Sequence, residues 1–288
     1  MSTKPADRPV LAAWSETLQL VRTHPSLFTP LGIAAAAKLA MVGTALVAPF
    51  APFSKLLAPM VRYFWGDIYL HYPYHLALPT RWFRRSDLLF PVLLEAFLVG
   101  MTAFLCRQIL TGHPAKFRQA FSETFRRYPA TVIITVITSV VMLVCARLFM
   151  IPIQYAARAI PGLASNGFAI AFAIAFVTVV VASALEAFFT FAIPLCVLNQ
   201  IAWFRALWRS LALAWRAYGL IVITVFIVSL SYLPFILLRQ GSVRMVTSGW
   251  PEGILLVYLG RVMMSWGISV LLAVWSTTYL FRTNQVKR

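Results

Sequence analysis

The sequence is poor in charged residues and especially in acidic ones. Only 11% of its 288 residues are Asp, Glu, Lys or Arg, whereas 61% are hydrophobic. A soluble domain usually carries about twice that share of charge, and one this apolar would expose patches large enough to aggregate. Since the bilayer is the natural solvent for such surface, we predict an integral membrane protein.

Signatures of catalysis and of cofactor binding are also missing. No GxSxG, HExxH, Walker-A or GxGxxG pattern occurs, and the chain has only eight carboxylates. His71 and His75 have a metal-like spacing, but Pro73 between them disfavours a regular helical turn. The three cysteines form no CxxC pair and are typical of small buried hydrophobes: Cys106, Cys145 and Cys196. We therefore expect no enzyme activity, cofactor or metal site.

Six apolar runs divide the chain. A spanning helix needs about 20 predominantly apolar residues, and each run is long enough for one. Helices satisfy their own backbone hydrogen bonds in lipid, and these runs are too long and too uniformly apolar for barrel strands. We expect one span in each of 29–52, 88–108, 129–152, 167–197, 218–238 and 253–281.

The formal net charge of +17 comes from short basic clusters between the apolar runs. This pattern argues against nucleic acid as the partner and favours retention of basic loops in the cytoplasm and attraction of anionic lipid. With the N-terminus inside, the inner segments carry 14 Lys and Arg and the outer segments carry 7. We predict cytoplasmic N- and C-termini, with the RWFRR cluster at 81–85 as the main evidence against this orientation.

Three inner segments have the spacing of amphipathic helices. In 113–128 and 203–216, aromatic side chains follow one stripe and arginines another, and Leu11, Trp14, Leu18 and Val21 form a similar stripe near the N-terminus. Such helices either lie in the headgroup plane or pack their aromatic face onto the spans. On the first interpretation, the lipid headgroups contact Arg118, Arg126, Arg127, Arg205, Arg209 and Arg216.

Short stretches of sequence recur at a distance of about 90 residues. FRRYPATVIITV at 125–136 resembles WRAYGLIVITV at 215–225, and Leu-Glu-Ala-Phe occurs at 94–97 and 185–188. The third unit lacks the tetrapeptide, and chance similarity of apolar sequence is the alternative. We predict a single all-α membrane domain, 1–288, with about six transmembrane helices. It would be built from three repeats of an amphipathic helix plus a helical hairpin, at about 9–108, 109–197 and 198–288.

Lys38, Glu95 and Glu186 are charged residues inside predicted spans. Such charges are costly in lipid and usually face protein or water. At about 1.5 Å per residue, both carboxylates lie roughly 18–20 Å from the inner boundary and Lys38 about 13 Å from it. We predict an intramembrane polar cluster of these three residues. The alternatives are a static ion pair, or a protonated Glu bonded to a neighbouring helix.

The order of amphipathic helix, span, loop and span, with basic and aromatic linkers such as FRALWRSLALAWRAYG at 204–219, resembles a group of bacterial six-span proteins. That group includes YciC-like inner-membrane proteins and the membrane domain that precedes some glycerophosphodiester phosphodiesterases. The resemblance covers most of the chain. It implies a location in the bacterial inner membrane and brings no established activity with it.

Three functions are consistent with these patterns. The protein binds or organises membrane lipid, mainly anionic, through its basic amphipathic helices. Alternatively, it transports a small molecule or lipid by means of the intramembrane carboxylates. In the third case it anchors a soluble partner, or a second copy of itself, at the inner face. Dependence on Glu95 or Glu186 separates the second function from the other two.

Overall fold

The computed structural model describes residues 8–79, 91–159, 167–240 and 251–286. Within these ranges the chain forms helices and turns and no β-strand, which confirms the predicted all-helical class. The helices are α1 (Arg8–Thr23), α2 (Thr29–Val47), α3 (Ser54–Trp65), α5 (Ala96–Leu110), α6 (Phe117–Arg126), α7 (Tyr128–Ala159), α9 (Gly167–Phe189), α10 (Ala192–Leu198), α11 (Trp203–Arg216), α12 (Tyr218–Leu230), α13 (Leu233–Gln240) and α15 (Gly253–Arg282). Shorter turns are η1 (Pro25–Phe28), η2 (Asp67–Leu70), η3 (Tyr74–Ala77) and the π-helical η4 (Pro91–Glu95).

Five helical segments of the described chain are long and apolar enough to cross a membrane. They correspond to five of the six predicted runs, because each run is uniformly apolar and carries few charges. Helices α7 and α15 contain 32 and 30 residues, more than a bilayer needs, and a tilt accommodates such length. The segments are Pro25–Val47, Val92–Leu110, Tyr128–Phe149, Ile170–Leu198 and Gly253–Arg282.

The run predicted as one span at 218–238 is not one continuous helix in the structure. This run forms two short helices, α12 and α13, separated by a turn at Ser231 and Tyr232. Pro234, the second residue of α13, has no N–H to continue the hydrogen-bond ladder of α12. Helix α12 also meets α11 at an angle of 99°, and the helices of the described ranges give six candidate spans if that bent pair counts as one.

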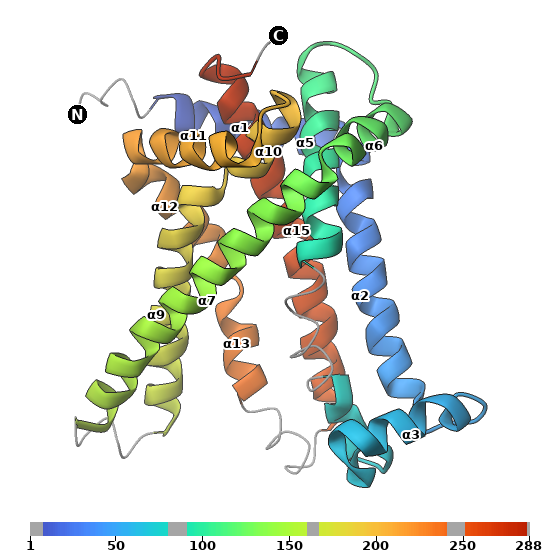
Figure 1. The fold of residues 1–288 in the computed structure, drawn as a ribbon. Helices are drawn as coiled ribbons and strands as arrows, with labels where there is room; N and C mark the ends of the chain where they lie inside the picture. The colour runs from blue at the N-terminus through green and yellow to red at the C-terminus, as the bar shows by residue number, and fades with distance from the viewer. Residues whose placement is uncertain (1–7, 80–90, 160–166, 241–250, 287–288) are drawn as a thin grey trace.

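Helices α1, α6 and α11 lie across one end of the bundle, and α3 lies across the opposite end (Figure 1). Helix α1 packs on α15 from the far end of the chain, α6 packs on the preceding α5, and α11 packs on α9 and the short α10 that precede it. The largest buried cluster lies at this end. At its centre, Trp275 stacks between Trp14 and Tyr279 and meets Phe191.

Candidate functional site

A cavity of about 380 Å³ lies between α5, α7, α9, α12 and α15. Its lining is unusually polar for the middle of an apolar bundle, since two carboxylates and eight hydroxyl groups reach it. Polar side chains at membrane depth are costly and usually mark a functional site. The polar lining consists of Glu95, Glu186, Thr135, Thr138, Thr190, Ser229, Tyr232, Ser265, Ser269 and Ser276.

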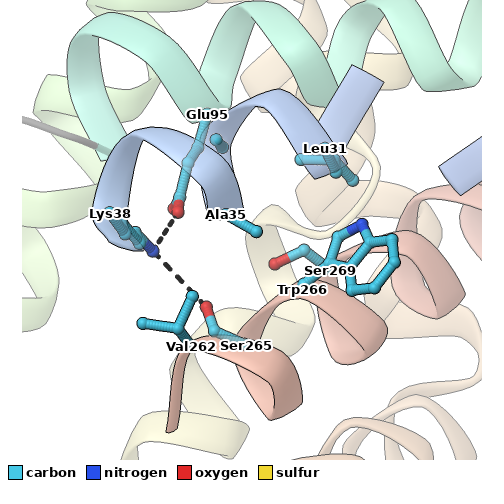
Figure 2. A pocket seen from close by; sticks show the side chains of 9 residues that line it. Leu31, Ala35, Lys38, Glu95, Val262, Ser265, Trp266 and Ser269 are labelled. Atoms are coloured by element: carbon cyan, nitrogen blue, oxygen red, sulfur yellow. Dashed lines mark hydrogen bonds and ion pairs between the residues drawn. The ribbon is translucent and has the colours of Figure 1, made fainter. Parts of the chain in front are cut away.

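Lys38 and Glu95 form an ion pair at a small void next to this cavity (Figure 2). Lys38 Nζ also lies 3.5 Å from the hydroxyl oxygen of Ser265 on α15. Both charged side chains are largely buried, with 16% and 19% of their surface exposed. Lys38 lines this void of about 10 Å³ and does not line the large cavity, whereas Glu95 and Ser265 line both. The ammonium group therefore neutralises Glu95 from outside the cavity.

Glu186, on α9, reaches the same cavity from a different wall. Within the described part of the chain, its carboxylate has neither a hydrogen bond nor an ion pair. The three residues of the predicted polar cluster thus surround one region, but only Lys38 and Glu95 are in contact. Glu186 faces the cavity with no counter-charge from the part of the chain that the structure describes.

Irregular backbone occurs beside the cavity in three of the segments that line it. The π-helical turn η4 continues directly into α5 after Glu95, α9 passes into α10 through a turn at Thr190 and Phe191, and α12 ends at the Ser231–Tyr232 turn. Pro194 in the first turn of α10 and Pro234 at the start of α13 lie just after two of these turns, where a missing N–H interrupts the hydrogen-bond ladder, and Pro91 is the first residue of η4. Irregular backbone at membrane depth is tolerated where it is enclosed by protein or lines a hydrated cavity.

Two tyrosines hold the carboxylate helices in the same way. The hydroxyl of Tyr128 donates to the backbone carbonyl of Leu93 at 2.9 Å, and that of Tyr218 donates to the carbonyl of Ala184 at 3.0 Å. Each accepting carbonyl lies two residues before a cavity carboxylate. Each tyrosine ring also packs on a Phe two residues after that carboxylate, Tyr128 on Phe97 and Tyr218 on Phe188.

The six arginines expected at lipid headgroups all lie on or beside α6 and α11. Five are exposed, namely Arg118, Arg126, Arg205, Arg209 and Arg216. Arg126 lies 3.4 Å from Glu123, and Arg205 lies over the ring of Phe204. Arg127 is different, because it donates a 2.6 Å hydrogen bond to the carbonyl of Gln200 and so joins α6 to the start of α11.

The aromatic stripes of α6 and α11 are largely exposed. Trp208 and Trp215 have 75% of their surface uncovered, and Phe125 has 60%. Their rings therefore do not simply pack onto the spans, which was one of the two interpretations of these stripes. Exposed aromatic residues beside exposed arginines suit a helix that lies at the membrane–water interface.

The end of the bundle that carries α3 has a separate group of polar contacts. Asp67 accepts a 2.6 Å hydrogen bond from Arg62 and lies 3.2 Å from His71. The bonds from Arg62 and His71 lower the pKa of Asp67, and burial lowers the pKa of His75. Among the described residues, no three His, Cys, Asp or Glu side chains are placed to hold a metal ion. The RWFRR cluster at 81–85 lies outside the described residues.

Sequence reasoning missed most of the hydroxyl lining. Ser265, Ser269 and Ser276 follow one another at intervals of four and seven residues on α15, which places them on one face of a helix. This spacing could have predicted a polar stripe along the helix. The contribution of Thr135 and Thr138 had no such signal, because it depends on how α7 crosses the bundle.

Comparison of the chain with models of protein families, with curated proteins and with solved structures finds no match.

Proposed function

We propose that this protein is a transporter that binds a small polar solute in the cavity between α5, α7, α9, α12 and α15. The observation that carries the proposal is the convergence of Glu95 and Glu186 on one cavity of about 380 Å³. Small-molecule sites usually have volumes of about 300–1,000 Å³. Broken helices around a polar site near the bilayer midplane are a recurring feature of secondary transporters.

The proposal includes the three-unit repeat that the sequence predicts. The span that starts each unit packs on the last span of another unit: α2 on α15, α7 on α5, and α12 on α9. The corresponding contacts of Tyr128 and Tyr218 also support equivalence of the second and third units. Three units of amphipathic helix plus hairpin would then surround the cavity, and the two copies of Leu-Glu-Ala-Phe would supply its two carboxylates.

The location and orientation are part of the proposal as well. The protein would lie in the bacterial inner membrane with α1, α6 and α11 at the cytoplasmic face. The excess of Lys and Arg in the inner segments supports this orientation. The gathering of these helices at the end of the bundle opposite to α3 is consistent with it (Figure 1).

Native mass spectrometry of the purified protein tests the function. The wild type should retain a small-molecule adduct that a Glu95→Gln, Glu186→Gln double variant loses. Glu252→Gln is the matched control. Glu252 lies directly before the first residue of α15, does not line the cavity, and is an exposed carboxylate that accepts a hydrogen bond from Tyr72. An identical adduct pattern in all three proteins would contradict a carboxylate-dependent site.

A second function, binding of anionic lipid through α6 and α11, is supported by the exposed Trp208 and Trp215 beside exposed arginines. Aromatic rings favour the headgroup region, and each Lys or Arg near an anionic surface adds about 1 kcal/mol. The two functions do not compete for residues, since the cavity and the exposed stripes are separate surfaces.

A further inference from the structure

The balance of charge in the cavity indicates what it binds. Among the residues that the structure describes, no Lys or Arg lines it, and Lys38 neutralises Glu95 from outside. Arg261, one turn before Ser265 on α15, does not line it either. Within the described ranges, Glu186 is thus left as an uncompensated carboxylate. Because an unpaired charge at membrane depth is costly, this carboxylate favours a bound positive charge or a proton.

The hydroxyl groups of the lining present oxygen lone pairs more than hydrogens. Four of them already donate their hydrogen to a backbone carbonyl of their own helix, at 2.8–3.1 Å: Thr135, Thr138, Thr190 and Ser276. A fifth hydroxyl oxygen, that of Ser265, lies within reach of the Lys38 ammonium group. A hydroxyl that has donated its hydrogen remains an acceptor. The cavity therefore favours a ligand that donates hydrogen bonds.

The size of the cavity favours an occupant larger than a bare metal ion. At about 30 Å³ for each water molecule, its volume corresponds to about a dozen waters. The rings of Phe189 and Tyr232 also line it. Aromatic faces attract organic cations, and they add apolar surface that an alkali ion would not use.

We propose that the cavity binds a small organic cation with N–H donors, that is, a protonated primary or secondary amine. This inference rests on the proposed function and names its class of solute. The ammonium group would pair with Glu186 and donate to the hydroxyl oxygens of Thr138, Thr190 or Ser276. Quaternary ammonium ions fit less well because they have no N–H to donate, and anions are disfavoured by the carboxylate.

The test is a thermal-stability titration of the purified full-length protein in detergent. The probes are n-butylammonium chloride, tetramethylammonium chloride, 1-butanol and sodium chloride at matched ionic strength. We expect saturable stabilisation by n-butylammonium alone, because a ligand that binds only the folded state raises its melting temperature. The midpoint concentration should rise at least tenfold in Glu186→Gln and remain unchanged in Glu252→Gln.

A second variant keeps the test decisive if Glu186→Gln does not fold. Thr138→Val keeps the shape of the side chain and removes one acceptor oxygen, so it should weaken the response to n-butylammonium several-fold. The inference is overturned if n-butylammonium does not stabilise the wild type, or if 1-butanol or sodium stabilises it equally well. It is also overturned if Glu186→Gln responds to n-butylammonium like the wild type. A neutral or anionic adduct that depends on Glu186 in mass spectra would overturn the choice of an amine while leaving the proposed transport site in place.

Discussion

The hydroxyl of Tyr128 bonds to the carbonyl of Leu93 across the junction of α7 with η4, and so fixes the backbone two residues before Glu95. Tyr218 makes the corresponding bond to Ala184, two residues before Glu186. Both tyrosines are the first residues of their helices, directly after α6 and α11. They therefore connect the helices at the end of the bundle to the backbone that carries the cavity carboxylates.

Removal of either hydroxyl should destabilise the protein modestly. A typical intramolecular hydrogen bond contributes about 0.5–1.5 kcal/mol, so Tyr128→Phe and Tyr218→Phe should each lower the free energy of unfolding by about that amount. Chemical denaturation in detergent would measure it. Tyr63→Phe is the control, because Tyr63 on α3 is 83% exposed. Equal stability of all four proteins would show that the two bonds contribute nothing.

The effects of substitutions at Lys38 and Glu95 on the free energy of unfolding should be strongly coupled. Lys38→Met leaves the Glu95 carboxylate without its cation in a largely buried position, and loss of one partner of a buried pair costs roughly 3 kcal/mol. The double variant Lys38→Met, Glu95→Gln should cost less than the sum of the single changes, because no charge is then left unpaired.

A double-mutant cycle on the free energy of unfolding measures this coupling. Lys55→Met, at an exposed position of α3, controls for loss of a lysine in general. If the two substitutions lower the free energy of unfolding additively, the Lys38 and Glu95 charges do not stabilise each other. Water or lipid headgroups would then solvate them.

The helices could be predicted because hydropathy and period are local properties of the sequence. Long apolar runs indicate spans, and aromatic and basic stripes indicate α6 and α11. The rise per residue places Lys38 and Glu95 at depths that a long lysine side chain can bridge, and the structure pairs them.

The remaining features depend on contacts between distant segments. The break between α12 and α13 could be anticipated only in part, since Pro234 is compatible with either a kink or a complete interruption. The bonds from Tyr128 and Tyr218 join residues 35 and 34 positions apart in the sequence. The cavity requires five helices to leave space at one level, and no single-helix pattern specifies that arrangement.

The segment around His75 should lose stability in mild acid. Burial lowers the pKa of His75 from its ordinary value of 6.5. Because the folded segment binds this proton less tightly than the unfolded one, the stability contribution is fully present above pH 6.5. It is lost as the pH falls through the lowered folded value. Hydrogen–deuterium exchange of residues 66–79, corrected for intrinsic rates, should be faster at pH 5.5 than at pH 7.5.

His75→Phe should remove this pH dependence, since no group at that position would then titrate between the two pH values. His113→Phe is the matched control, because His113 is exposed before α6. Asp67 contributes only at lower pH: its pKa lies below the ordinary 3.8, so its bonds to Arg62 and His71 persist at pH 5.5. Exchange that is equally fast at both values in the wild type would contradict the prediction.

The exposed arginines of α11 should provide selectivity for anionic lipid. Replacement of Arg205, Arg209 and Arg216 by Gln removes three charges, each contributing about 1 kcal/mol near an anionic surface. Quenching of tryptophan fluorescence by brominated lipids should show that the wild type prefers anionic over zwitterionic species and that the triple variant does not. A variant with Lys55→Gln and Arg62→Gln, which removes two charges from α3 at the other end of the bundle, controls for loss of basic charge in general.

The orientation is testable because α6 and α3 lie at opposite ends of the bundle (Figure 1). Single cysteines at Ser122 on α6 and at Ser54 on α3 should react with an impermeant maleimide from opposite sides of the membrane. The background must lack the native thiols, of which Cys145 is partly exposed. With the predicted orientation, Ser54→Cys is labelled in intact spheroplasts and Ser122→Cys only in inverted vesicles. The reverse result would place the basic helices outside. Since that arrangement violates the retention of Lys and Arg in the cytoplasm, it would make the RWFRR cluster the dominant topogenic signal.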